Sequence, residues 1–247
     1  MKCIILCAGF GTRLYPLTIN KPKALLKIGD GLIIEYILER LEKIKSIDEI
    51  FIVSNEKFYL QFVWWLEKLK HPLKNKIKIT NDNVLTNEKR IGGLGDLSFV
   101  MKSNRIEEDV LIVLGDNFFN FGLDKFIEFF EKNKKTCICV YDVGNREKAK
   151  RFGVVTLTKN NRKIVSIEEK PEEPKTTLAS IGIYIFTKDD LKKFEEYMGG
   201  DLNKEGPAYF VKYLLEGQDV LGYVCQGEWH DVGTVEQYNE LNKFKTL

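Results

Sequence analysis

The chain opens with KCIILCAGFGTR at residues 2–13, and this stretch decides the fold. Residues 2–8 are almost continuously apolar and run into glycine, a pattern that predicts a buried strand of a parallel sheet. The next glycines, Gly9 and Gly11, leave backbone N–H groups open to an anion because no Cβ stands in the way. The stretch therefore predicts a strand that ends in an anion-binding loop.

Two familiar glycine-loop patterns do not fit this loop. A dinucleotide-binding turn needs a third small residue at the start of a helix, but position 14 is Leu. Pro16 and Pro22 also prevent the following residues from forming that helix. A Walker A loop is excluded because no Gly-Lys-Ser or Gly-Lys-Thr follows the glycines.

Basic residues follow the glycines instead. Arg13 offers a planar fork for phosphate oxygens, and Lys21 and Lys23 add compact charges after a proline-stiffened segment. The alternative interpretation is a surface loop with ordinary solvated cations. Because the glycines lie at a strand end, we expect a site for a multiply charged anion such as a triphosphate.

Strand and helix patterns alternate through the first half of the chain, which predicts an α/β fold with a mostly parallel sheet. The further expected strands are 49–54, 76–80, 109–114 and 136–142, and the expected helices are 32–45, 56–69 and 123–133. After residue 150, short polar links join strand-like runs and predict an antiparallel or mixed extension. Its expected strands are 152–158, 163–168, 179–187 and 220–225, and its expected helices are 188–198, 207–216 and 234–246.

Composition narrows the function classes. The net charge of +2 shows no basic excess for a nucleic acid or an anionic membrane. Only His71 and His230 are histidines, and the five cysteines have no metal-ligand spacing, so zinc or histidine-based chemistry is not expected. The first apolar run is too short for a signal peptide, and no run approaches a membrane span. We therefore expect a cytoplasmic protein.

Two aspartates lie at positions where ligand-binding residues can occur, at a strand end and beside a glycine turn. Asp116 follows the apolar strand 109–114, at the end where ligands bind in open α/β sheets. Asp231 lies beside a glycine turn in GEWHDVGT, residues 227–234. The two lie 115 positions apart, and either alone is commonly a cap or turn residue.

Residues 8–29 resemble the signature of the sugar-1-phosphate nucleotidylyltransferases, G-x-G-T-R-L-x-P-x-T followed by a Lys-Pro element. The resemblance implies a Rossmann-like three-layer α/β sandwich, with a mostly parallel mixed central sheet and a small antiparallel sugar-binding extension. It also implies one domain over 1–247, with a nucleotide-binding half at about 1–142 and a sugar-binding half at about 143–247. Residues Ala8, Gly9, Gly11 and Thr12 then wrap the triphosphate of the nucleotide, and Arg13 and Lys23 act as catalytic residues on its phosphates.

Other segments match the same family up to about residue 240. The G-D and W-x-D-x-G-T elements imply that Asp116 and Asp231 hold Mg²⁺, a cation that prefers oxygen ligands, with Asp116 also at the nucleotide. An E-K-P element implies that Glu169 binds sugar hydroxyls and Lys170 binds the sugar phosphate. The F-G-V-V and G-x-Y elements add Gly153 and Gly182 to the sugar side.

Two departures from the family pattern matter. The segment 86–97 keeps glycines, including Gly93 near the nucleotide, but lacks the glutamine that reads the base in members using dTTP or UTP. Asn87, Glu88 and Arg90 occupy this region, so the base stays open and cytosine or another base is an alternative. The chain also stops soon after the expected helix 234–246, so we expect no allosteric nucleotide site of the kind that further C-terminal helices carry.

The resemblance implies transfer of a nucleotidyl group from a nucleoside triphosphate, dTTP or UTP by default, to a sugar 1-phosphate, by default glucose 1-phosphate. The partners are these two substrates, with a homo-oligomer as an open option. Alternatives are a non-catalytic nucleotide-sugar-binding regulator on the same fold and a cytidylyltransferase acting on another sugar or alcohol phosphate. A nicotinamide oxidoreductase lacks support because Ser54 and Asn55 stand where its acidic residue is expected.

Overall fold

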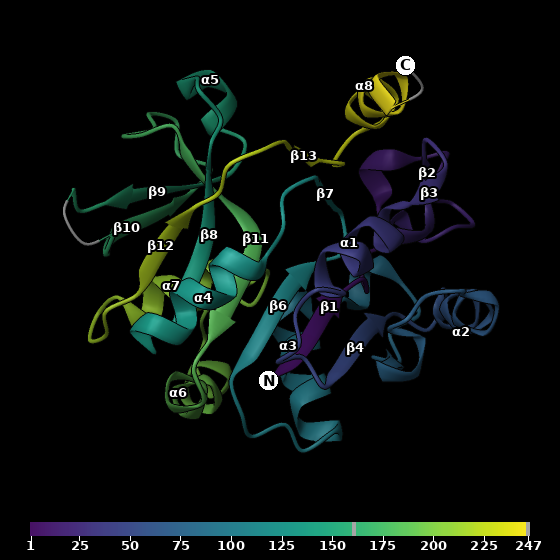
Figure 1. Cartoon of the computed structure of the whole chain (residues 1–247), viewed down its shortest axis with the longest axis horizontal. Helices are drawn as coiled ribbons and strands as arrows, with labels where there is room; N and C mark the ends of the chain where they lie inside the picture. Colours follow the sequence, from purple (N-terminus) through teal and green to yellow (C-terminus); the bar gives the residue numbers. More distant parts are fainter. Residues whose placement is uncertain (160–161, 246–247) are drawn as a thin grey trace.

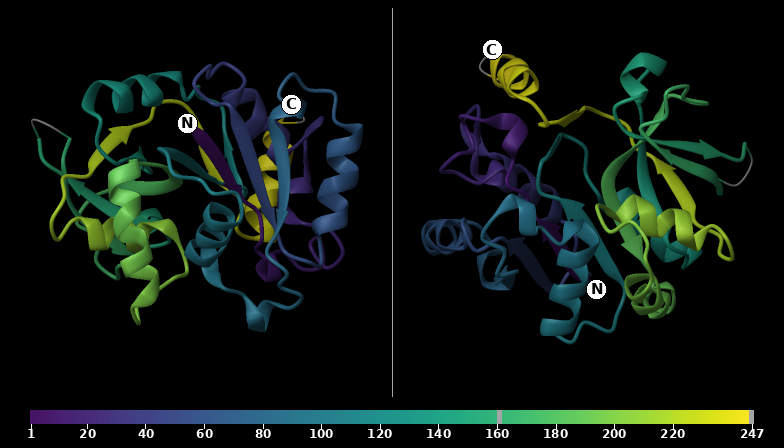
Figure 2. Two further views of the ribbon diagram at one scale, coloured as in Figure 1. Left: turned by 90° about the horizontal axis from the view of Figure 1, so that it is seen from below. Right: turned by 180° about the vertical axis from the view of Figure 1, so that it is seen from behind.

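The computed structural model describes residues 1–159 and 162–245. A nine-stranded mixed sheet crosses the molecule, and helices cover both of its faces (Figures 1 and 2). Two smaller antiparallel pairs of strands lie outside the main sheet. The α/β architecture predicted from the sequence is therefore confirmed.

The first half of the chain builds the parallel part of the sheet. Strand β1 (Lys2–Leu6) lies between β4 (Glu49–Ser54) and β6 (Val110–Leu114), and β5 (Ile77–Asn81) lies outside β4, all parallel. Because the four strands run in one direction, their carboxyl ends meet at the same edge of the sheet. That edge is where the glycine loop and Asp116 emerge.

The second half adds a mixed extension. Strand β11 (Leu178–Phe186) runs antiparallel to β6 and also pairs with β8 (Cys137–Asp142) and β9 (Gly153–Leu157). Strand β10 (Ile164–Glu169) lies outside β9, and β12 (Leu221–Val224) runs parallel to β8. The expected strand 136–142 therefore does not extend the parallel set, because β11 occupies the place beside β6.

Alternate residues of β1 enter two different hydrophobic clusters, as the pleat of a strand requires. Cys3 and Ile5 pack with α1 (Ile33–Leu41), α2 (Tyr59–Lys68) and α4 (Asp124–Asn133) on one face. Their neighbours Ile4 and Leu6 pack on the other face, with three further helices. Those helices are α3 (Gly92–Ser103), α6 (Lys188–Gly199) and α7 (Pro207–Leu214).

Helix α3 was not expected from the sequence. Its first turn contains Gly92, Gly93 and Gly95, and each glycine lowers helix stability by about 1 kcal/mol relative to alanine. The helix forms because Leu94, Leu97 and Val100 are fully buried against the sheet. Tertiary packing here overrides a weak local propensity.

The C-terminal segment returns to the glycine loop. Strand β13 (Trp229–Asp231) pairs antiparallel with β7 (Asn117–Phe119), directly after β6. Helix α8 (Val235–Lys245) then lies beside the N-terminal segment, where the Tyr238 hydroxyl donates to the Lys27 carbonyl at 2.8 Å (Figure 1). Position 246 of the expected helix 234–246 lies outside the described residues.

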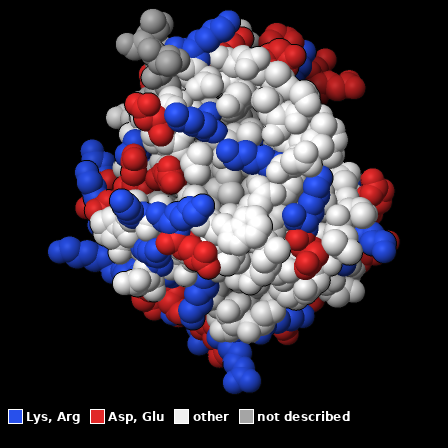
Figure 3. Space-filling view, turned by 90° about the vertical axis from the view of Figure 1, so that its right-hand side faces the viewer, with Lys and Arg blue, Asp and Glu red and all other residues white. Residues whose placement is uncertain are grey.

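Three short elements complete the N-terminal and middle segments. They are β2 (Lys27–Ile28), β3 (Gly31–Leu32) and α5 (Arg146–Ala149). The surface carries mixed charge, with basic and acidic side chains interspersed on the face in Figure 3.

Among the described residues, no helix is long and apolar enough to cross a membrane. All five cysteines are buried and free, as expected for small core residues.

Candidate active site

A cavity of about 590 Å³ opens at the carboxyl edge of the parallel strands. The glycine loop forms one wall, and residues from the starts of α3 and of the turn after β10 contribute others. The sequence-predicted residues that line it are Ala8, Gly9, Gly11, Thr12, Arg13, Lys23, Gly93, Asp116 and Lys170. The fold thus gathers residues separated by more than 150 positions into one hollow.

Two buried side chains hold the glycine loop in shape. The Thr18 hydroxyl donates to the Gly11 carbonyl at 2.7 Å, and the Asn55 amide donates to the Ala8 carbonyl at 2.7 Å. Gly11 has a φ of 63°, a conformation that favours glycine. Gly9 is exposed, and a Cβ there would meet nothing within 4 Å, so its backbone faces open space. Side-chain hydrogen bonds therefore hold the loop in place, while its outer surface stays open to a ligand.

Lys23 and Asp116 form the charged centre of the cavity. The Lys23 Nζ donates to Asp116 Oδ2 at 2.8 Å, across 93 positions of sequence. Burial would raise the pKa of Asp116, but the charge and hydrogen bond of Lys23 hold this pKa below its usual range. Asp116 is thus a carboxylate at neutral pH, and 36% of its side chain stays accessible.

The structure brings Asp231 near Asp116, although Asp231 lines a neighbouring hollow with Arg151 and His230 rather than the 590 Å³ cavity itself. The β7–β13 pairing places Asp231 opposite Asn117, and the Val232 N–H donates to the Asp116 carbonyl at 3.3 Å. Burial raises the pKa of Asp231, and the negative charge of Asp116 raises it further. A divalent cation held by these carboxylates would offset their repulsion, so the chemistry of the pair fits Mg²⁺.

Two carboxylates leave most of a magnesium coordination shell to other ligands. In the described part of the chain, no group of three or more Asp, Glu, His or Cys side chains could hold a metal. Mg²⁺ commonly takes one or two carboxylates and completes its shell with water and substrate phosphates. The cavity has room for those phosphates beside the glycine loop.

Strand β10 ends at Glu169 and Lys170 follows it; of these two, Lys170 lines the 590 Å³ cavity. Lys170 has a φ of 45°, an uncommon conformation for a residue other than glycine, and its backbone N–H donates to the Phe152 carbonyl. Glu169 lines a smaller hollow of about 220 Å³ with Tyr209. A Cβ on Gly153 would lie 3.0 Å from Glu169 Oε2, so this glycine allows the carboxylate to approach the strand.

Two predicted glycines also have structural roles. Gly182 has a φ of 75° and is buried, and a Cβ there would lie 2.7 Å from Leu114 Cδ1. It shapes the end of β6 rather than lining the 590 Å³ cavity. Gly93 lines that cavity, but its N–H already donates to the Glu205 carbonyl at 2.9 Å. A ligand would meet its other backbone atoms.

Three acidic residues of the cavity were not predicted from the sequence: Glu205, which is exposed, and two buried aspartates. Asp82 directly follows β5, and Asp96 lies in the first half of α3. Each is only 8% exposed. The segment from Thr86 to Leu97 lacks the glutamine of the family pattern, but Asp82 lies before this segment. The glycines near Asp96 gave no indication that it lies in a helix. The position of Asp82 after a strand did not indicate that it would lie close to Asp96.

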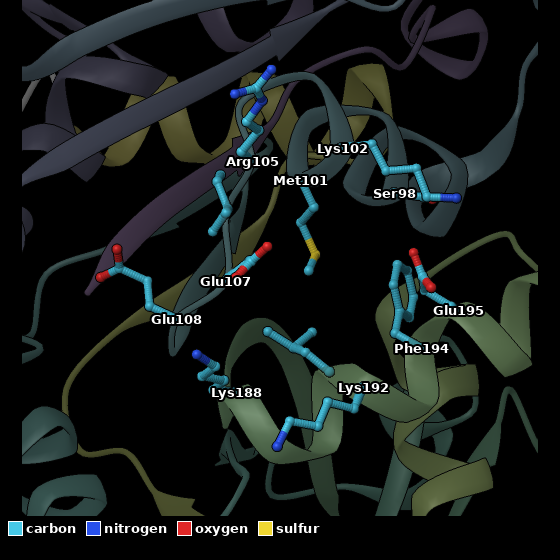
Figure 4. A pocket seen from close by; sticks show the side chains of 12 residues that line it. Ser98, Met101, Lys102, Arg105, Glu107, Glu108, Lys188, Lys192, Phe194 and Glu195 are labelled. Carbon is cyan, nitrogen blue, oxygen red and sulfur yellow. The ribbon is translucent and has the colours of Figure 1, made fainter.

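A second hollow of about 560 Å³ lies between α3 and α6, away from the glycine loop (Figure 4). Lys102 and Arg105 extend away from its centre, while Met101 points into it. Its charged side chains therefore do not converge on a common point. The 590 Å³ cavity is the better candidate for chemistry.

A loop of open backbone amides faces Lys23 and Asp116 across one cavity, and Asp231 lies opposite Asn117, the neighbour of Asp116, on the adjoining strand pair. This arrangement defines an α/β protein built to hold a polyanionic ligand. The chain belongs to the nucleotidyl transferase family, whose family model matches residues 2–246. The resemblance found in the sequence is therefore confirmed at the level of the family.

Individual relatives agree with this assignment. The bifunctional protein GlmU of Methanocaldococcus jannaschii is 32% identical over 99% of this chain and 54% of its own length. The glucose-1-phosphate thymidylyltransferase of Streptomyces antibioticus is 26% identical over 98% of this chain and 65% of its own length. The chain thus spans about half to two thirds of these relatives.

A solved structure shows the same fold. The crystal structure of a UDP-glucose pyrophosphorylase complexed with UDP-glucose superposes with a TM-score of 0.81 at 22% identity. The match covers 98% of this chain and 97% of that one. The two proteins therefore share the same architecture over nearly their whole length.

Proposed function

We propose that this chain transfers a nucleotidyl group from a nucleoside triphosphate to a sugar 1-phosphate and releases pyrophosphate. The observation that carries the proposal is the Lys23–Asp116 pair beside the glycine loop, with Asp231 held next to Asp116 by the β7–β13 pairing. Lys170 lines the same cavity from the second half of the chain. Cations for two phosphate groups thus surround one space, and the proposed metal carboxylates lie at its edge.

The proposed reaction is a single in-line displacement. An oxygen of the sugar phosphate attacks the α-phosphorus, the new P–O bond forms, and the bond from that phosphorus to the leaving pyrophosphate oxygen breaks. The loop amides at Gly9 and Gly11 hold the triphosphate, and Arg13 and Lys23 offset the charge that moves to pyrophosphate. Positioning and electrostatic stabilisation provide the catalysis, so no covalent intermediate is needed.

Asp116 and Asp231 would hold Mg²⁺ in this proposal. The bound cation would supply positive charge against the phosphate oxygens of the substrates. Lys23 already neutralises part of the charge on Asp116, so the pair and the lysine together balance the site. Asp231 is the carboxylate whose raised pKa a cation would lower.

The second half of the chain is proposed to receive the sugar phosphate. Lys170 would bind its phosphate, and Glu169 would accept hydrogen bonds from sugar hydroxyls. The Tyr184 hydroxyl bonds Ser180 at 3.0 Å, and the charges of Glu169 and Asp116 contribute to its raised pKa after burial. Because β11 pairs with β6, we propose that both halves act as one domain.

Pyrophosphate release tests the proposal. The protein is incubated with Mg²⁺, glucose 1-phosphate and, in parallel, dTTP, UTP, CTP, ATP and GTP. We expect release with one or more triphosphates, dependent on both metal and sugar phosphate. Nucleotide binding without release, with glucose 1-phosphate and then with other sugar and alcohol phosphates, would instead assign a non-catalytic nucleotide-binding protein.

A further inference from the structure

Asp82 and Asp96 form a buried carboxyl pair in the wall of the 590 Å³ cavity. The Asp82 backbone N–H donates to the Ser54 carbonyl at 2.9 Å, and its Oδ1 accepts from the Val84 N–H at 2.7 Å. These bonds fix the Asp82 carboxyl at the end of β5. Asp96 reaches the same point from α3, and the two carboxyls are hydrogen-bonded.

The pair shares one proton at neutral pH. Burial, and then the charge of Asp82, raise the pKa of Asp96 to about 8. A hydrogen bond between two carboxyls needs this proton, which Asp96 supplies to Asp82. The pair therefore presents several acceptor lone pairs, a single negative charge and one proton.

No cation neutralises the pair within residues 1–159 and 162–245. Arg90 lines the same cavity, but it donates to Glu205 at 3.0 Å. A buried, unpaired charge is costly to the fold, and such costs are typically found at functional sites. The remaining acceptor lone pairs of the two carboxyl groups are therefore available to hydrogen-bond donors of a ligand in the cavity.

The sheet order sets the distance between the pair and the proposed phosphate site. Asp116 follows β6 and Asp82 follows β5, and β1 and β4 lie between these strands. Three strand spacings separate them, about 14 Å. With the phosphates beside Asp116 and the glycine loop, an extended nucleotide directs its base toward Asp82 and Asp96.

We propose that the Asp82–Asp96 pair selects a nucleoside triphosphate whose base carries an exocyclic amino group. Adenine, cytosine and guanine each offer such an amino group, and a carboxylate accepts from it. Uracil and thymine present carbonyl oxygens on both sides of a single N–H, and these would face the negative charge of the pair. The inference rests on the proposed function for its biological meaning, and it runs against the default substrates dTTP and UTP.

Direct binding measurements test this choice of base without requiring turnover. Isothermal titration calorimetry with Mg²⁺ gives the Kd of ATP, CTP, GTP, UTP and dTTP. We expect at least one amino-bearing triphosphate to bind at least about tenfold more tightly than UTP and dTTP. If it is CTP or GTP, the matched comparison with UTP or inosine triphosphate, which lacks the amino group, isolates that group.

Variants of the pair sharpen the test. Asp82→Asn replaces the charged acceptor with an amide that also donates, and we expect the ratio of affinities to fall to within about threefold or to reverse. Asp96→Asn keeps a donor toward Asp82, so we expect it to retain most of the selectivity. Melting temperatures check that both variants fold. UTP or dTTP binding as tightly as every amino-bearing triphosphate, or an unchanged ratio in folded Asp82→Asn, would overturn the inference.

The two proposals fail in different ways. Absence of pyrophosphate release with all five triphosphates, in spite of selective binding, would remove the transferase function and leave the base selection standing. Pyrophosphate release with a preference for UTP or dTTP would support the transferase function and overturn the proposed base selection.

Discussion

At the residue scale, Lys23 is the side chain on which most of the proposed chemistry depends. Its ammonium contacts Asp116 and lies in the cavity beside the glycine loop, with 13% of the side chain accessible. Removing one well-aimed donor of this kind typically raises a barrier by about 3–4 kcal/mol. We therefore predict that Lys23→Ala slows turnover at saturating substrates by roughly a hundredfold or more.

Lys21 supplies the matched control for this prediction. It lies in the same segment, is exposed, and does not line the cavity. Lys21→Ala should change turnover by less than about threefold. Near-normal turnover in Lys23→Ala, measured as pyrophosphate release, would contradict the assigned role.

Asp96 gives a prediction for stability against pH. Its pKa is about 8 in the folded protein and near the ordinary aspartate value when unfolded, so between these values the unfolded chain has lost a proton that the folded protein keeps. Stability therefore falls as pH rises through this window, by up to about 1.4 kcal/mol per unit from this group. Asp96→Asn removes the titration and mimics the protonated acid.

The measurement is urea unfolding of both proteins from pH 5 to pH 8. We predict that Asp96→Asn gains stability relative to the parent protein as pH rises. A constant difference between the two proteins across this range would show that Asp96 titrates normally.

At the element scale, the glycine loop depends on a neighbouring strand end. Asn55 is fully buried, donates to the Ala8 carbonyl, and accepts from the Phe58 N–H at 3.0 Å. Asn55→Ala leaves both backbone groups without this partner, and we predict a loss of about 1–3 kcal/mol in the free energy of unfolding. Gln61→Ala removes a comparable but exposed bond to the Asn20 carbonyl and should cost less than about 0.5 kcal/mol. Equal losses in the two variants, measured by urea unfolding, would contradict this account.

Most elements could be predicted from the sequence because their patterns are local. The expected strand 49–54 coincides with β4, and the expected helix 123–133 matches α4 to one residue. Helix α3 could not be predicted, because its stability comes from buried contacts that three glycines conceal. The β7–β13 pair could not be predicted for another reason, because three-residue strands more than 100 positions apart carry no periodic signal.

At the scale of the whole molecule, the candidate site exists because distant segments meet at one sheet edge. The glycine loop and Lys23 could be recognised from their motif, and Asp116 from its place at a strand end. The placement of Asp231 near Asp116, and the pairing of Asp82 with Asp96, are products of the fold. Sequence motifs thus predicted the proposed phosphate side of the site, while the proposed base side required the structure.

The central claim is that this cavity transfers a nucleotidyl group to a sugar phosphate. The most direct test quantifies nucleotide sugar and pyrophosphate in one reaction with Mg²⁺, for the parent protein and for Asp231→Asn. We predict equal amounts of the two products from the parent protein, none after EDTA treatment, and a fall of at least about a hundredfold in the variant. Pyrophosphate without nucleotide sugar, or unimpaired synthesis by Asp231→Asn, would contradict the account.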